Sequence, residues 1–429
     1  MDKQNIAFLF GSGVSFETLG ESSSVDSITK RIYNNPSSTD DEELIRDFST
    51  IHSGAIGRES SKNSDPTRID QLIKFLRQIE REFGINGKPL NYEDLYGILD
   101  QYLEDTEQVN RRNRIRAPER IEIIDNIASQ IFGKYTKTSS SEIPSTRTVA
   151  NQTRTWISLI VKQALTGTES PKGFDALIPL LNNPDINRIH FATLNHDLLL
   201  DQFLESFHNS NYGTCEVIHG FDAQTRLGEP NGKDFRLFDP ASFRETTSPS
   251  YSSDKKQIIL YKLHGSIDWI EIKSTPKNGE AFRKYIKTEN ILPKPDGIIS
   301  VEYLPRFLTG NVLKYHQYLA GIFADMHTRF RDNLRFGIIN HLIVSGYGFG
   351  DPGINLLIGE WLSEDPSQRK LHVLDKSLDK EKILEKLRHL PYSQQENFRD
   401  IIGSSIHSRK FYLSNLKEIR IKKGELSFS

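Results

Sequence analysis

The chain has 429 residues, of which 26% are charged, and its formal net charge at pH 7 is −2. This length provides for about two to three domain-sized units, and the charge balance indicates neither a nucleic-acid nor a membrane surface. The single cysteine, Cys215, excludes an intramolecular disulfide and any multi-cysteine zinc site. The sequence shows neither the apolar core of a secretory signal nor the roughly 20 apolar residues of a bilayer span. We therefore expect a soluble, cytoplasmic protein, and we interpret the basic run at residues 111–116 as a solvated helix face rather than a nucleic-acid contact.

Short apolar runs, each followed by glycine or polar residues, predict the buried strands of a parallel sheet. Helical patterns separate these runs, so the fold class is α/β with a mostly parallel sheet. The five predicted strands are residues 6–10, 189–193, 257–263, 341–345 and 371–374.

A long region between the first two predicted strands carries apolar residues at helical spacing. We interpret it as a large helical insertion after the first strand, spanning about residues 65–185, that packs over the sheet edge or above its carboxyl ends. Its predicted helices are residues 69–83, 92–103, 121–132, 153–165 and 174–181.

The remaining segments have weaker patterns. Three stretches rich in serine, threonine, glycine or proline are predicted to be irregular, and they are residues 136–151, 212–256 and 276–296. The C-terminal part, residues 376–429, is predicted to hold a charged helix at 378–390 and short strands at 410–413 and 419–421.

A glycine turn follows the first predicted strand directly. A strand that enters a helix through glycines is a common way to bind a phosphate with main-chain groups. Gly11 and Gly13 would let the backbone approach a pyrophosphate, and Ser15 would donate to a phosphate or cap the helix. The same pattern also occurs in simple tight turns, the third glycine of the dinucleotide fingerprint is absent, and no Walker lysine follows.

Two polar segments follow the second and third predicted strands. Asn195 and Asp197 come just after the second strand, where an open α/β sheet binds its ligands, although they could equally cap the next helix. His264 follows the third strand and is suited to proton exchange near neutral pH, or to a structural hydrogen bond with a carbonyl. His196 is interpreted as structural, because strand alternation turns it away from its two neighbours.

A second glycine turn follows the fourth predicted strand. Ser345, Gly346 and Tyr347 could hold a ribose or phosphate through backbone donors. Asp351 is interpreted as a helix start, and Asp375, after the fifth strand, as a helix cap rather than a ribose ligand.

Taken in order, the motifs GSGVS, TLNHD, KLHGS and SGYGFGD at strand ends resemble the sirtuin-like superfamily. The resemblance is greatest to the bacterial sirtuin-like NAD hydrolases of anti-phage defence, and it implies a Rossmann-like, NAD-binding catalytic domain over residues 1–375. The resemblance also implies that Asn195 and Asp197 hold the nicotinamide ribose and that His264 is the catalytic base. The residues that it implies for binding the dinucleotide are Gly11, Ser12, Gly13, Ser15, Thr193, Ser345, Gly346 and Tyr347.

The chain departs from the protein deacylases of that superfamily in two ways. It cannot build their four-cysteine zinc ribbon, and it has Leu194-Asn195-His196-Asp197 where they have glutamine, asparagine, isoleucine and aspartate. The resemblance therefore implies NAD⁺ as substrate and no metal. It further implies a homo-oligomer and, from size and architecture, a HerA-like hexameric ATPase as partner.

The resulting hypothesis is cleavage of the nicotinamide–ribose bond of NAD⁺ to nicotinamide and ADP-ribose. Two alternatives stay open at this point. One is a non-catalytic module that senses NAD⁺ or ADP-ribose, which would need the glycine turns but not His264. The other is a nuclease, although no close cluster of residues has the spacing of metal ligands.

Overall fold

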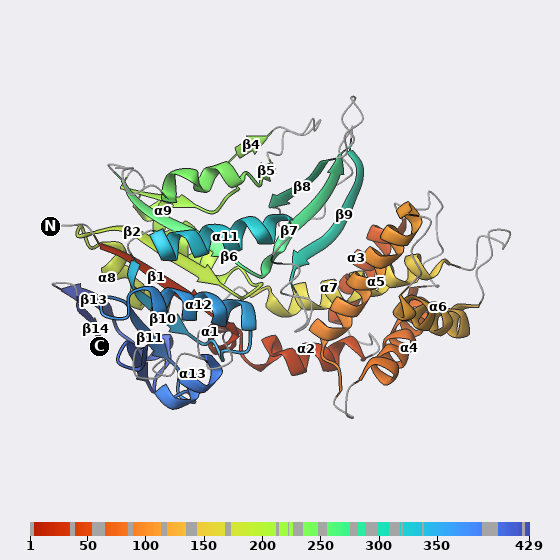
Figure 1. The fold of residues 1–429 in the computed structure, drawn as a ribbon. Helices are drawn as coiled ribbons and strands as arrows, with labels where there is room; N and C mark the ends of the chain where they lie inside the picture. The colour runs from red at the N-terminus through yellow and green to blue at the C-terminus, as the bar shows by residue number, and fades with distance from the viewer. Residues whose placement is uncertain are drawn as a thin grey trace. The chain divides into compact units, whose positions relative to one another are not determined.

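The computed structural model divides into two compact units, which are described separately (Figure 1). The first comprises Met1–Gly20, Thr166–Phe307 and Lys314–Ser429, and the second comprises Glu21–Leu165 and Leu308–Leu313. The structure describes residues 4–34, 39–53, 65–84, 89–112, 118–133, 144–167, 173–211, 214–221, 223–225, 235–247, 255–274, 282–287, 298–308, 318, 321–336, 339–387, 402–422 and 425–429.

The first unit is built on a parallel sheet, which has seven strands among the described residues. All five predicted strands are confirmed, and every neighbouring pair in this sheet is parallel. The strands, in their order across the sheet, are β12 (Ile406–Arg409), β11 (Lys370–Leu374), β10 (Ile339–Ser345), β1 (Gln4–Phe10), β2 (Ile186–Thr193), β6 (Lys256–Lys262) and β3 (Cys215–Ile218). The predicted α/β, Rossmann-like class is therefore confirmed.

The order of the strands reverses between β1 and β10. From β1 the chain order continues through β2 and β6 in one direction, whereas β10, β11 and β12 follow one another in the other direction. In open α/β sheets, ligands bind at such a switch point, outside the carboxyl ends of the strands. The two glycine turns lie at this switch point.

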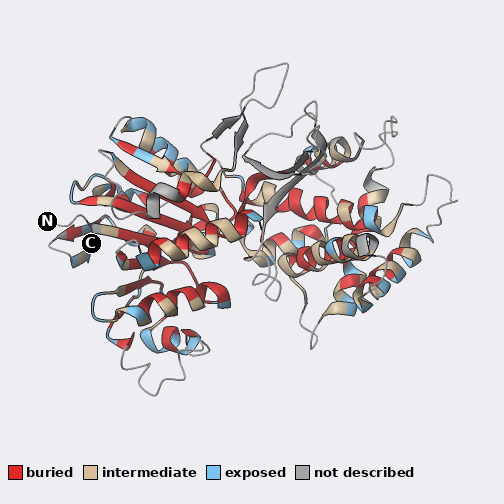
Figure 2. Ribbon diagram, turned by 45° about the horizontal axis from the view of Figure 1, so that its top comes forward, coloured by how far each residue is buried: buried red, intermediate tan, exposed pale blue. Residues whose placement is uncertain are grey.

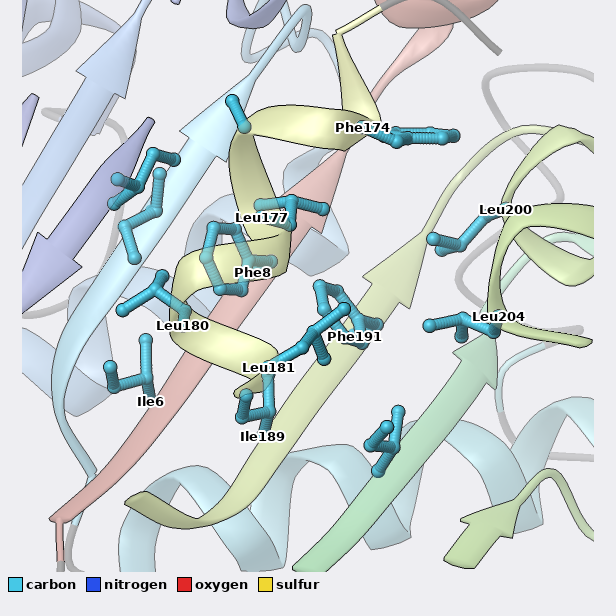
Figure 3. Close-up of a cluster of buried hydrophobic side chains, with 14 of the residues drawn as sticks. Ile6, Phe8, Phe174, Leu177, Leu180, Leu181, Ile189, Phe191, Leu200 and Leu204 are labelled. Atoms are coloured by element: carbon cyan, nitrogen blue, oxygen red, sulfur yellow. The ribbon is translucent and has the colours of Figure 1, made fainter. Parts of the chain in front are cut away.

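Both faces of the sheet are covered, which explains why its strands are continuous apolar runs. On one face, side chains from alternate positions, among them Phe8 and Phe191, pack under η2 (Phe174–Leu177) and α8 (Ile178–Leu181) (Figure 3). On the other face, Tyr261 contacts Phe330 of α11 (Gly321–Phe336), with their ring centroids 5.4 Å apart. The buried residues follow the strands of this unit along their length (Figure 2).

The remaining helices of the first unit connect or flank the strands, and five of them matter for the site or for the predictions. They are α1 (Ser12–Leu19), α9 (Leu199–Ser210), α12 (Pro352–Glu364), α13 (Lys380–Leu387) and the short 3-10 helix η5 (Leu413–Asn415). The predicted helix at 378–390 corresponds to α13, and its last three residues lie outside the described part of the chain.

Two of the segments predicted to be irregular contain strands of a second sheet, so those predictions are wrong in part. The order of this antiparallel sheet is β4 (Ala223–Thr225), β5 (Phe235–Leu237), β8 (Phe282–Lys287), β7 (Gly265–Ser274) and β9 (Ile298–Phe307). The predicted strand at 410–413 is also wrong, because the chain forms β12 just before it and η5 at its end. Residues 419–421 do form a strand, β13 (Ile419–Lys422), which pairs with β14 (Glu425–Phe428).

The second unit is helical. Its helices are η1 (Glu21–Ser23), α2 (Val25–Ile32), α3 (Thr39–Ser53), α4 (Asp65–Phe83), α5 (Tyr92–Arg112), α6 (Glu119–Phe132) and α7 (Thr146–Leu165). The insertion expected at about 65–185 overlaps this unit, which begins earlier and ends earlier. The predicted loop at 136–151 is wrong from Thr146 onward, because α7 starts there and the Ser145 hydroxyl accepts the Thr148 N–H in the manner of a helix cap. Most of the basic run at 111–116 lies outside the described residues.

Two buried histidines of the first unit should make stability fall in mild acid. Burial lowers the pKa of His190 to about 3, and burial with neighbouring His341 lowers the pKa of His372 to about 3. The unfolded chain binds protons at these sites below about pH 6.5, whereas the folded chain does not, so stability present above pH 6.5 is lost as the pH falls toward 3. At pH 5 each histidine is expected to lower the free energy of unfolding by about 2 kcal/mol relative to its value above pH 6.5.

Urea denaturation at pH 7.5 and pH 5 would measure this loss. His190→Gln and His372→Gln are expected to reduce the difference between the two pH values, whatever they do to stability at pH 7.5. An unchanged difference in both variants would contradict the prediction.

Within the described residues, no helix is both long enough and apolar enough to cross a membrane.

Candidate functional site

The four sequence motifs lie at the carboxyl ends of four adjacent parallel strands, β6, β2, β1 and β10. Backbone hydrogen bonds continue between these segments beyond the strands themselves. Leu263 N–H donates to Thr193 O at 2.9 Å, and Leu194 N–H donates to Phe10 O at 2.9 Å. Gly11 N–H donates to Ser345 O at 3.0 Å. The turns that carry the predicted site residues are therefore side by side along one edge of the sheet.

The two glycine turns interlock at the switch point. Gly13 N–H donates to Gly346 O at 2.9 Å. A Cβ atom on Gly11 would lie 2.5 Å from Gly346 O, and a Cβ on Gly13 would lie 2.8 Å from Gly346 Cα. Gly346 has φ of +65°, and a Cβ there would lie 2.6 Å from Val14 N. These glycines are needed because two backbones pass each other too closely for any side chain.

This contact bears on the prediction that Gly11 and Gly13 bind a diphosphate. Their N–H groups donate to carbonyls of the turn after β10, so the structure gives these amides a partner within the protein. Ser12 is the first residue of α1 and is exposed. The N-terminal end of a helix attracts anions through its dipole and its unpaired N–H groups, and Ser12 is the exposed residue at this helix start.

Asn195 is fixed by hydrogen bonds at both its backbone and its side chain. Its N–H donates to Thr193 Oγ1 at 3.0 Å, and its Nδ2 donates to Gly11 O at 3.0 Å. Because a carbonyl accepts from Nδ2, the amide cannot be flipped, and Oδ1 must be the remaining atom. Oδ1 is buried and has no hydrogen-bond partner among the described residues. The side chain therefore presents one unsatisfied acceptor at the carboxyl end of β2.

Asp197 joins the turn after β2 to helix α1. Its Oδ2 accepts the hydroxyl of Ser15, and its Oδ1 accepts the N–H of Leu199 at 3.0 Å. Burial raises the pKa of Asp197, and the charge of Lys262 and the hydrogen bond from Ser15 oppose that rise. Lys262 also donates to Asp197 O at 2.6 Å. Ser15 is thus engaged by Asp197, and both carboxylate oxygens already have protein partners.

The second glycine turn contains one buried hydroxyl and one strained residue. Ser345 is 1% exposed, and its Oγ has no hydrogen-bond partner within the described part of the chain. Phe349 has φ of +54°, which is uncommon for a residue other than glycine. Its carbonyl accepts Asn355 Nδ2 at 3.0 Å, and its ring lies 4.9 Å from that of Tyr347. Such strain persists only where the surroundings hold it, so this turn is rigidly specified.

Tyr347 stabilises the same turn through hydrogen bonds of its hydroxyl group. The single hydroxyl proton is shared between Asn355 Oδ1 at 2.9 Å and Asp351 O at 3.0 Å, and the oxygen accepts Asp351 N–H at 3.1 Å. Burial raises the pKa of Tyr347 well above its usual value. Its predicted contact with a dinucleotide would therefore come from its backbone.

His264 is buried and contacts two residues that the sequence did not link to it. Its Nε2 lies 2.6 Å from the Tyr318 hydroxyl and 3.1 Å from Asp351 Oδ2. Asp351 also caps α12, as predicted, through Oδ1. The interpretation of Asp351 as a helix start is confirmed but incomplete. The same side chain that caps α12 also contacts His264.

Two further histidines surround this group. The ring of His196 lies 6.3 Å from that of His264, and the ring of His327 lies 4.7 Å from that of Tyr318. Burial lowers the pKa of His327 to about 4, so this residue is neutral near pH 7. His196 is buried beside His264, and a periodicity argument could not have shown this neighbour.

The described residues include no group of three or more histidine, cysteine, aspartate or glutamate side chains arranged to hold a metal ion.

Asp375, predicted to be a cap, does accept the N–H groups of Ser377 and Leu378 at 2.7 and 3.2 Å.

A parallel α/β sheet whose strand order reverses at two interlocked glycine turns defines a Rossmann-like type of protein. An amide, an imidazole and hydroxyls lie at the adjoining strand ends. Residues 189–400 match the family model of the SIR2-like domain. This match supports a sirtuin-like family, is compatible with NAD-dependent activity and suggests that NAD⁺ is involved. It covers Asn195, His264 and the turn after β10, whereas the turn after β1 lies before it. A comparison with curated proteins finds no match.

Proposed function

We propose that this chain is an NAD⁺ glycohydrolase, which cleaves the bond between nicotinamide and ribose. The observation that carries the proposal is the anchored amide of Asn195. Its Nδ2 is held by Gly11 O, and its buried Oδ1 awaits a donor at the carboxyl end of β2. A buried acceptor without a donor costs free energy, and a ribose hydroxyl or a water molecule would satisfy it.

The reaction adds water to the ribose carbon that bears nicotinamide. NAD⁺ and water give nicotinamide, ADP-ribose and one proton. Nicotinamide leaves as a neutral molecule and takes the bonding electron pair, so it needs no general acid. The protein's task is to orient the ribose, to stabilise the positive charge that develops on it and to accept the proton.

Each predicted residue then has a role that fits its surroundings. Asn195 Oδ1 accepts a hydrogen bond from a ribose hydroxyl or from the water. His264 accepts the proton of that hydroxyl or water, a role that commonly contributes about 10²–10⁴-fold. Asp197 acts mainly by holding the Asn195 turn against α1, because Ser15 and Leu199 already engage its carboxylate.

The dinucleotide itself would lie along the switch point. Ser12 at the start of α1 is placed to meet the diphosphate. The buried Ser345 hydroxyl and the backbone of Gly346 and Tyr347 would face the adenosine side. NAD⁺ enters this scheme as substrate, and no step in it requires a metal.

Incubation of the full chain with NAD⁺, followed by chromatography, tests the proposal. Nicotinamide and ADP-ribose appearing in equal amounts, with or without a chelator, would support it. Calorimetric binding of NAD⁺ without products would favour a non-catalytic sensor instead. If NAD⁺ is neither bound nor cleaved, the proposal is overturned.

The biological setting is a further part of the proposal, and it rests on the sequence resemblance. The chain would act in bacterial anti-phage defence by depleting NAD⁺, as a homo-oligomer and with a HerA-like hexameric ATPase as partner. Measuring cellular NAD⁺ after phage infection, in cells with the wild-type chain and with His264→Ala, tests this role. Equal NAD⁺ levels in the two strains would contradict it.

A further inference from the structure

The imidazole of His264 meets a phenol and a carboxylate that come from distant parts of the chain. Its Nε2 lies 2.6 Å from the Tyr318 hydroxyl and 3.1 Å from Asp351 Oδ2. The Tyr318 hydroxyl also donates to Asp351 Oδ2, at 2.8 Å, so the three groups form a closed triangle. All three residues are at least 90% buried, where the weak screening by solvent makes their electrostatic interaction strong.

Asp351 is held on its other side by the start of α12. Its Oδ1 accepts the N–H groups of Gly353 and Ile354 at 2.9 and 3.2 Å, and its backbone bonds the Tyr347 hydroxyl. A helix cap needs one acceptor oxygen, which serine, threonine or asparagine supply equally well. The start of α12 therefore accounts for Oδ1, and its dipole also favours a negative charge on Asp351. The cap does not use Oδ2, which contacts His264 and Tyr318 instead.

We propose that Asp351, together with Tyr318, is a positioning residue for His264, which it orients and whose protonated form it stabilises. This inference rests on the proposed function. An acidic partner on one ring nitrogen sets the tautomer of a histidine, and the other nitrogen then exchanges protons with the ligand. Here the acidic partner, Asp351, contacts Nε2 at 3.1 Å.

Among the described residues, two more histidines and an arginine lie near this triangle. His196 lies beside the His264 ring on the β2 side, and His327 of α11 lies against Tyr318, with Arg331 of the same helix lowering the pKa of His327. Positive charge on any of them would oppose a protonated His264. Asp351 provides the negative charge that makes proton acceptance at this position favourable.

Asp351→Asn is the direct test, because asparagine keeps the capping oxygen and the size of the side chain but removes the charge. We expect kcat for nicotinamide release to fall roughly tenfold or more, with KM changed by less than about threefold. We also expect the acidic limb of the kcat/KM profile to move to lower pH by about one unit, because His264 loses a neighbouring negative charge and releases its proton more readily.

Asp375→Asn is the matched control. Asp375 follows the adjacent strand β11, is 8% exposed and caps the next turn, but it is not part of the His264 triangle. We expect the acidic limb of the kcat/KM profile of Asp375→Asn to coincide with that of the wild type. If both aspartates served only as caps, the acidic limb would stay at the wild-type pH in both variants, and that result would overturn the inference.

A measurement without NAD⁺ separates this inference from the proposed function. The imidazole NMR signal of His264, identified by its absence in His264→Gln, should titrate at lower pH in Asp351→Asn than in the wild type. Identical titrations would overturn the inference even if the enzyme cleaves NAD⁺. A wild-type chain that cleaves no NAD⁺ would instead overturn the proposed function, while the titration still decides the link between the two residues.

Should Asp351→Asn fail to fold, Tyr318→Phe provides a second test. It leaves the cap and the ring contact with His327 intact and removes only the hydroxyl. We expect a lower kcat at unchanged KM, and a wild-type kcat in this variant would overturn the role given to Tyr318.

Discussion

Asn195→Ala is expected to reduce nicotinamide release by at least about 10²-fold while leaving the fold intact. The side chain makes one hydrogen bond to the protein, from Nδ2 to Gly11 O, and its Oδ1 makes none among the described residues. Loss of that one bond should cost only about 1 kcal/mol of stability. The effect on the reaction should be far larger, because the acceptor for the ribose hydroxyl or the water disappears. Steady-state nicotinamide release, measured beside urea denaturation, would show both effects.

Asn183→Ala is a suitable control for this variant. Asn183 lies before the opposite end of β2, where its Oδ1 accepts the Asp185 N–H at 2.9 Å. We expect its turnover to stay within about twofold of the wild type, because it removes a similar local hydrogen bond far along the strand from the crevice. Comparable losses in both variants would show that Asn195 matters through stability, and would remove the main support for the proposed reaction.

His264→Ala should also nearly abolish nicotinamide release, but by a different route. The imidazole is the proposed proton acceptor, so its loss removes a contribution of about 10²–10⁴-fold. The variant also removes the imidazole from the triangle and leaves the hydrogen bond from Tyr318 to Asp351. Calorimetry should still detect NAD⁺ binding, and wild-type turnover in this variant would rule out His264 as the base.

The parallel sheet was predictable because each of its buried strands shows its burial in its own short sequence. A strand buried on both faces carries a run of apolar residues, and β1, β2, β6 and β10 each contain such a run. The edge strand β3 was missed because it is four residues long and contains the exposed Glu216. The second sheet was missed because its antiparallel strands need no apolar run, as the charged Arg283 and Lys284 of β8 illustrate.

The candidate site was predictable to the extent that parallel strands end at a common edge. That rule alone brings the turns of Asn195, His264 and Gly346 together. It says nothing about which side chains bond across the crevice, because those contacts depend on tertiary packing. Ser15 and Asp197 are 182 positions apart, and His264 and Asp351 are 87 apart.

The interlocked turns lead to the largest expected effect on the fold. Gly346→Ala should lower the free energy of unfolding by about 3 kcal/mol or more, because it combines backbone strain with a steric clash. The residue has φ of +65°, and the new methyl group would lie 2.6 Å from Val14 N, a backbone atom that cannot rotate away. NAD⁺ binding should be lost together with stability, since separating the turns displaces Gly11, whose carbonyl anchors Asn195.

Gly348→Ala, two residues later in the same turn, makes the comparison decisive. Gly348 is exposed, and a Cβ there would meet nothing within 4 Å, so its stability should change by no more than about 0.5 kcal/mol. Urea denaturation and calorimetric titration with NAD⁺ would measure both variants. If the close approach of the two backbones builds the crevice, only Gly346→Ala should lose stability and binding. Equal stability and equal affinity in the two variants would mean that the turns can separate without consequence, and that the crevice depends on something other than their contact.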